Sequence, residues 1–98
     1  MTVKPGFAPY KLNETEVLEK VEKSHRLIVW NDDVNSFDWV ILTLMEICDH
    51  TQEQAEQCAM LIHSRGKYAV KNGDFETLRP LAEAIIDRGI NATVEGED

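Results

Sequence analysis

Residues 25–31, HRLIVWN, form the most constraining segment of this chain, because they contain the dense apolar run Leu27-Ile28-Val29-Trp30. Its β-branched and aromatic side chains favour an extended strand, and their continuity favours a buried one. The polar triplet Asn31-Asp32-Asp33 ends the run, since Asn and Asp are turn and cap residues. The chain therefore needs a fold in which other elements cover a short sheet that contains this strand.

The remaining elements follow from helical spacing, strand alternation and stop residues. Thr51 begins a capping-box pattern, and Gly66 is a good stop for the helix that it opens. Pro80 is tolerable in a first turn if Thr77 is the cap, and would kink a helix that begins at Asp74. In chain order the sequence predicts a strand over 25–31, helices over 36–48 and 51–65, a strand over 67–71, a helix from Asp74 or Thr77 closed by Arg88 and Gly89, and a strand over 90–95.

The order β-α-α-β-α-β predicts an α+β fold with a three-stranded sheet covered by three helices. A chain of 98 residues fits one domain, because a second core would leave neither half enough apolar surface to bury. Pro5, Gly6 and Pro9 interrupt any regular element near the N-terminus. We therefore expect a flexible extension over 1–23 and a folded domain over 24–98.

The net charge of −8 belongs entirely to the predicted domain. Four lysines and four glutamates cancel within residues 1–23, which leaves 6 basic against 14 acidic side chains in the rest. This acidity argues against partners such as nucleic acid or anionic membranes and favours partners with a localised positive group. The absence of a long apolar run, of a secretory signal and of a disulfide pattern around Cys48 and Cys58 indicates a cytoplasmic protein.

Enzymatic and metal-binding functions have weak support in this sequence. It has no glycine-rich phosphate loop and no recognisable nucleophile motif. The spacing of Cys48, His50, Cys58 and His63 differs from that of structural zinc sites. We therefore expect no catalytic residue, no metal and no cofactor, with a small metal-responsive protein as a minor alternative.

The residues best suited to specific chemistry are the triplet Asn31-Asp32-Asp33 and His63. An amide, two carboxylates and an imidazole supply acceptors for an ammonium group. Phe37, Val40 and Ile62 would place apolar surface beside that group, which suits the N-terminal residue of a peptide. The simpler interpretation is also open: the triplet ends a strand, His63 is solvated at a helix end, and the apolar residues belong to the core.

Over residues 24–95 the chain resembles the ClpS family, adaptors that deliver proteins with N-degrons to the Clp AAA+ protease. The resemblance rests on the strand that ends in Asn31-Asp32-Asp33, on Asn35-Ser36-Phe37 at the start of a helix, and on the later motif His63-Ser-Arg-Gly66-Lys67. It implies a monomeric, non-enzymatic adaptor that docks on the N-terminal domain of a ClpA- or ClpC-type unfoldase. It also implies that the unfoldase engages residues 1–23 during delivery.

The resemblance assigns roles to individual residues. Asn31 and His63 match positions that hold the free α-amine of the substrate, and Asp32 matches the residue that holds its first backbone groups, with Asp33 in the same motif. The positions that line the pocket for a first residue such as Leu, Phe, Tyr or Trp are Phe37, Val40, Thr43, Ala59 and Ile62. Phe37 at the rim could narrow this choice, and a pocket role for Ile90 stays open.

A different class of function shares the same fold. The C-terminal domain of the ribosomal stalk protein has a related architecture and binds its factors through a helix surface. A protein-interaction domain of that kind predicts no small pocket and no response to blocking of the substrate's amine.

Overall fold

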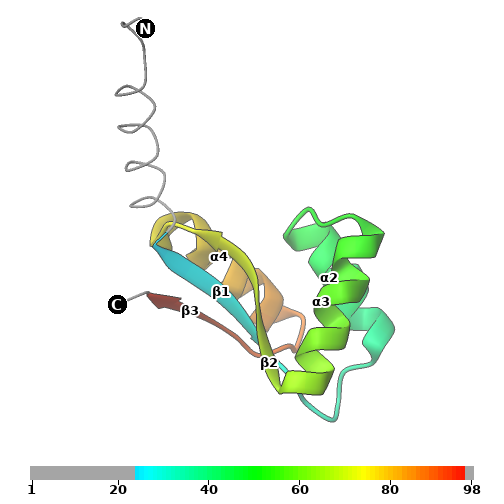
Figure 1. Ribbon diagram of the computed structural model, residues 1–98. Helices are drawn as coiled ribbons and strands as arrows, with labels where there is room; N and C mark the ends of the chain where they lie inside the picture. The colour runs from blue at the N-terminus through cyan, green and yellow to red at the C-terminus, as the bar shows by residue number, and fades with distance from the viewer. Residues whose placement is uncertain (1–23, 97–98) are drawn as a thin grey trace, which may run out of the picture.

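The computed structural model describes residues 24–96, which form three strands and three helices in the predicted order β-α-α-β-α-β. Figure 1 shows the sheet and α4 beside a pair of helices, α2 and α3. The predicted extension over 1–23 lies outside the described residues. The elements are β1 (His25–Trp30), α2 (Phe37–Ile47), α3 (Gln52–Arg65), β2 (Lys67–Gly73), α4 (Phe75–Asp87) and β3 (Ala92–Gly96).

The apolar run is the central strand of an antiparallel sheet with the order β2-β1-β3. Leu27 and Val29 are at most 1% exposed, because they point from β1 into the core. The pairing shifts between Leu27, opposite Lys71, and Ile28, opposite Ala69, so β2 carries one extra residue there. β2 runs to Gly73, two residues beyond the predicted strand.

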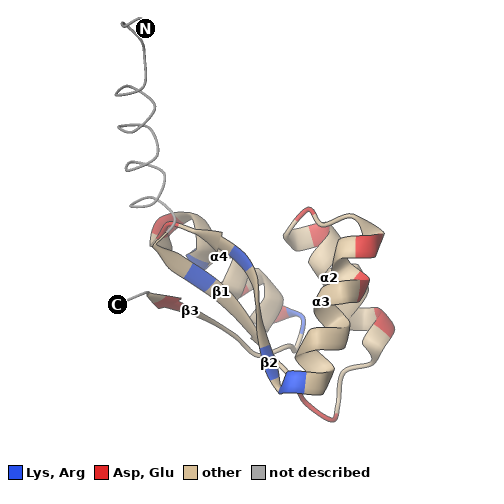
Figure 2. Ribbon diagram, viewed as in Figure 1, with Lys and Arg blue, Asp and Glu red and all other residues tan. Residues whose placement is uncertain are grey.

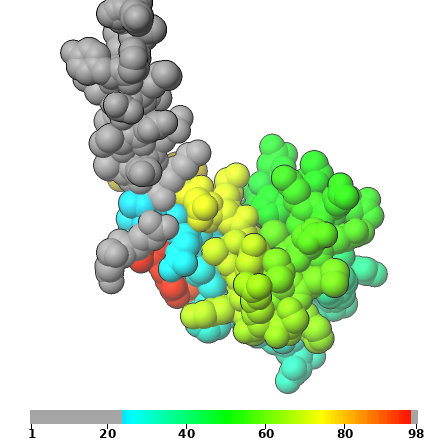
Figure 3. Space-filling view, in the orientation of Figure 1, coloured from blue at the N-terminus to red at the C-terminus, as the bar shows by residue number. Residues whose placement is uncertain are grey.

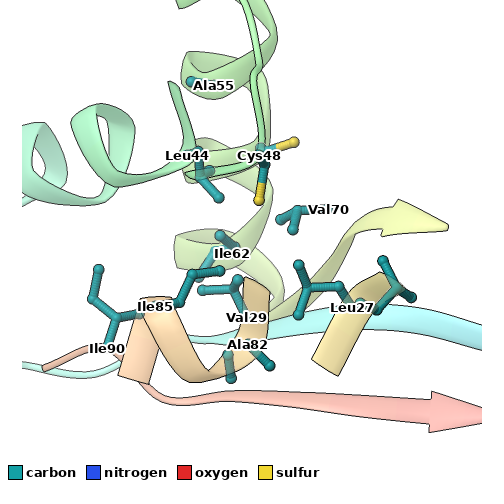
Figure 4. Packing of buried hydrophobic residues seen from close by; sticks show 13 residues of the cluster. Leu27, Val29, Leu44, Cys48, Ala55, Ile62, Val70, Ala82, Ile85 and Ile90 are labelled. Atoms are coloured by element: carbon teal, nitrogen blue, oxygen red, sulfur yellow. The ribbon is translucent and has the colours of Figure 1, made fainter. Parts of the chain in front are cut away.

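The helices pack in two groups around one core. α4 contacts all three strands, while α2 packs mainly on α3, which leads directly into β2 (Figure 1). Figure 4 shows Leu44 of α2, Ile62 of α3 and Ile85 of α4 converging near Val29. Ile90, whose role was open, is 2% exposed and belongs to this core.

Local signals place the helix ends as the sequence indicates. Thr51 and Gln54 form the reciprocal capping box of α3, and Gly66 ends that helix at a φ of 89°, where a Cβ would be strained. Asp74, rather than Thr77, caps α4 and accepts a 2.7 Å hydrogen bond from the Thr77 N–H. Pro80 therefore lies inside the helix, which continues past it. Among the described residues, none of the helices is long and apolar enough to cross a membrane.

Candidate functional site

Two backbone hydrogen bonds fix the point where β1 ends and the polar loop begins. The Asn31 N–H donates to the Gly66 carbonyl at 2.8 Å, and the Trp30 N–H donates to the Asn91 carbonyl at 3.0 Å. Gly66 is the C-cap of α3, one turn after His63. The loop therefore brings Asn31 to the end of the helix that carries His63.

The carboxylate of Asp32 folds this loop. One oxygen accepts from the Val34 N–H at 2.8 Å and the Asn35 N–H at 2.7 Å, and the other accepts from the Asn35 side chain at 2.8 Å. These hydrogen bonds, the one from the Asn35 N–H first, lower the pKa of Asp32 below its usual 3.8. Asp32 is thus ionised at neutral pH, and its loop contacts use three of about four acceptor positions.

Asn35, which the sequence analysis placed only at the start of a helix, is a further residue of this site. Its side-chain amide donates to Asp32 and also to the Gly89 carbonyl, at 2.8 Å in each case. Ser36 is the actual N-cap of α2 and accepts from the Trp39 N–H at 3.1 Å. The Asp-x-x-Asn spacing signals the bond to Asp32, but the bond to Gly89 spans 54 positions and has no local signal.

These elements enclose a cavity of about 340 Å³, a size typical of small-molecule sites. The loop supplies polar side chains, the first turn of α2 supplies Phe37 and Val40, and the last turns of α3 supply the rest. Figure 2 shows acidic residues in the loop after β1. The lining residues are Asn31, Asp32, Asp33, Asn35, Phe37, Val40, Ala59, Ile62 and His63.

The cavity gathers every side chain that the sequence nominated except Thr43. Thr43 lies on α2 one turn beyond Val40 and is 1% exposed. Its hydroxyl is buried and has no hydrogen-bond partner within residues 24–96. Thr43 and Val40 are one turn apart on α2, as the helical spacing predicts. Of these two residues, only Val40 lines the cavity.

The cavity combines two kinds of surface. Ala59 and Ile62 are 2% and 3% exposed and contribute an apolar wall with Val40, while His63 and the loop residues are more accessible. Side-chain oxygens and an imidazole nitrogen beside an apolar recess suit a ligand with a positive or donor-rich head and a hydrophobic body.

The four residues of the metal-binding alternative are not brought together. His50 donates from Nε2 to the Val70 carbonyl at 3.0 Å, and its Nδ1 lies 3.9 Å from the Cys58 sulfur. Burial raises the pKa of Cys48 to about 11 and lowers that of His50. His63 instead lines the cavity that contains Asn31. Residues 24–96 hold no cluster of three potential metal ligands.

The role of Asp32 in the loop predicts a specific acid response. Because its folded-state pKa is lowered, its contribution to stability is complete above about pH 3.8 and is lost as the pH falls through the folded-state value. An NMR titration of the Asp32 carboxyl carbon should give a midpoint below 3.8. The Asp32→Asn variant should lack this part of the acid dependence of unfolding. A midpoint at or above 3.8 contradicts the role of Asp32 as a hydrogen-bond acceptor in this loop.

Comparisons with known proteins identify the family. The model for "ATP-dependent Clp protease adaptor protein ClpS" matches residues 20–93. The ATP-dependent Clp protease adapter protein ClpS of Synechococcus elongatus is 29% identical over 86 residues, which cover 87% of this chain and 90% of that protein. Its namesake in Synechococcus sp. strain CC9902 is 29% identical over 98 residues, or 99% of this chain and 94% of that protein.

A solved structure shares the fold. Agrobacterium tumefaciens ClpS2 bound to L-phenylalaninamide aligns with a TM-score of 0.69 at 20% identity, over 74% of this chain and 95% of that one. Since the family model also spans most of the sequence and includes both the polar loop and His63, the chain belongs to the ClpS family of Clp protease adaptors.

Proposed function

We propose that this protein is a non-enzymatic adaptor that binds the free N-terminus of protein substrates and delivers them to a Clp AAA+ unfoldase and its protease. The preferred first residue is bulky and hydrophobic, namely Leu, Phe, Tyr or Trp. The observation that carries this proposal is one cavity in which polar Asn31 and His63 adjoin the apolar wall of Ile62.

The polar side of the cavity receives the α-amine. The Asn31 side-chain oxygen and a His63 ring nitrogen each accept one N–H of the ammonium group. Asp32, ionised and already fixed in its loop, accepts from the first backbone groups with its remaining position, and Asp33 adds negative charge at the mouth. An acidic loop thereby favours a cationic N-terminus over a neutral one.

The apolar side receives the first side chain. Val40, Ala59 and Ile62 form its wall, and Phe37, which is 44% exposed, stands at the mouth and narrows the choice of residue. Burial of a Leu- or Phe-sized group contributes roughly 1.5–3 kcal/mol. Together with two charge-assisted hydrogen bonds and the cost of association, this suggests affinity on the order of micromolar.

The ligand of the Agrobacterium relative supports this choice of substrate. L-phenylalaninamide, named with ClpS2, has a free α-amine next to a benzyl side chain. The cavity described here offers acceptors and an apolar wall in the same combination. An interaction domain that binds only through a helix surface has no use for such a cavity.

Delivery requires a second contact, with the unfoldase. We assign this contact to the N-terminal domain of a ClpA- or ClpC-type unfoldase and propose that the unfoldase engages residues 1–23 while the domain holds the substrate. The adaptor acts as a cytoplasmic monomer in this scheme.

Fluorescence polarisation with short labelled peptides tests the binding step. A peptide that begins with Phe should bind about 30-fold more tightly than the same peptide with Ser first, because about 2 kcal/mol of burial is lost. Equal binding of both peptides contradicts the proposal. Delivery is tested separately, by degradation of a reporter with an N-terminal Phe by the unfoldase and protease, with and without the adaptor.

A further inference from the structure

A second cavity, of about 310 Å³, shares Phe37 and His63 with the first. The rest of its lining comes from the outward face of α3, which belongs to the green surface on one side of the molecule in Figure 3. Phe37 and His63 therefore border both cavities. The full lining is Phe37, Gln57, Met60, Leu61, His63 and Ser64.

This second cavity is apolar and lies open to solvent. Met60 is 61% exposed and Phe37 is 44% exposed, although large apolar side chains are usually more deeply buried. The lining contains no Asp, Glu, Lys or Arg, in a domain that is otherwise acidic. An apolar recess that adjoins a binding site is suited to an apolar group of the same ligand.

The α3 residues that line the second cavity follow one face of that helix. Met60 lies one helical turn before His63, and Gln57 lies one turn before Met60, so the cavity extends along α3 away from the residues that receive the amine. A substrate chain that starts between Asn31 and His63 and continues along this face passes over Met60.

We propose that the second cavity binds an apolar side chain at the third residue of the substrate, an inference that rests on the proposed function. In an extended chain, alternate side chains point to the same side and are about 6.6 Å apart. When the first side chain enters the first cavity, the third faces the same surface on the far side of Phe37. The second side chain points away into solvent, so its polarity has little effect.

Three Phe-starting peptides test this inference by fluorescence polarisation: one with Leu at the third residue, one with Leu at the second, and one with Ser at both. Leu at the third residue should tighten binding about 5-fold, which corresponds to partial burial of one side chain. Leu at the second residue should leave affinity unchanged. In the Met60→Ser variant the gain should disappear, while the peptide with Ser at both positions binds as before.

The matched control is Ile86→Ser, which removes a similarly exposed apolar side chain, 48% exposed, from α4. This variant should retain the full gain, and thermal melts should show both variants folded. A gain that persists in Met60→Ser, or an equal gain from Leu at the second residue, overturns the inference. Either result leaves the preference for Phe over Ser at the first residue intact, so it is distinguishable from a failure of the proposed function.

Discussion

Acetylation of the N-terminus of a Phe-starting peptide is expected to weaken its binding at least about 100-fold. Two hydrogen bonds from a charged amine contribute about 1.5–3 kcal/mol each, and each 1.4 kcal/mol is a factor of about ten. The acetyl group removes the charge and the donors, and it leaves the acceptors of Asn31 and His63 desolvated and unpaired. Sites built to hydrogen-bond one group reject analogues that lack it for the same reason.

Variants at these two residues show where the acetylation penalty arises. Asn31→Ala and His63→Ala should each weaken the free peptide about 10-fold, because each removes one charge-assisted bond. Each variant should also reduce the difference in affinity between the free and the acetylated peptide, which a double-mutant cycle measures. Binding of the acetylated peptide itself should not weaken, because each variant removes an acceptor that this peptide leaves unpaired.

The matched control for these variants is Asn72→Ala, at an exposed asparagine of β2 that does not line the cavity. It should bind both peptides as the wild type does. If Asn31→Ala and His63→Ala also leave affinity unchanged, the triplet only ends a strand and His63 is only a helix-end residue. Equal binding of free and acetylated peptides is equally decisive against an amine-binding site.

The features that sequence reasoning anticipated correctly depend on near neighbours. The capping box of Thr51 closes within one turn, and Gly66 ends α3 through its own backbone conformation. The apolar run of β1 similarly requires burial wherever it lies in the fold. Such signals place the polar loop at one end of the central strand and His63 one turn before the end of a helix.

The features that sequence reasoning missed depend on contacts between distant segments. Asn35 reaches the Gly89 carbonyl across 54 positions, so its part in the loop follows from the packing of α4. The bulge in β2 follows from its pairing with β1. The exclusion of Thr43 from the cavity lining likewise reflects how deeply α2 and α3 pack, which helical register does not specify.

The size of the first cavity depends on Ala59, and this dependence predicts a change of specificity. Ala59 is 2% exposed and lines the cavity with only a methyl group. In Ala59→Met the longer side chain should occupy space that a bulky aromatic residue requires. Overpacking of this kind costs typically 1–3 kcal/mol, so binding of a Trp-starting peptide should fall about 30-fold.

A Leu-starting peptide is the internal control for this variant, because a smaller side chain fits the space that remains and its affinity should fall less than about 3-fold. Ala84→Met, at a half-buried alanine of α4 outside the cavity lining, should change neither affinity. Equal losses for both peptides in Ala59→Met, with the protein still folded in a thermal melt, contradict the model of Ala59 as the wall that sets the size limit. A selective loss of Trp instead places the first side chain against Ala59, a residue that makes no contact with the amine, and so locates the hydrophobic half of the ligand independently of Asn31 and His63.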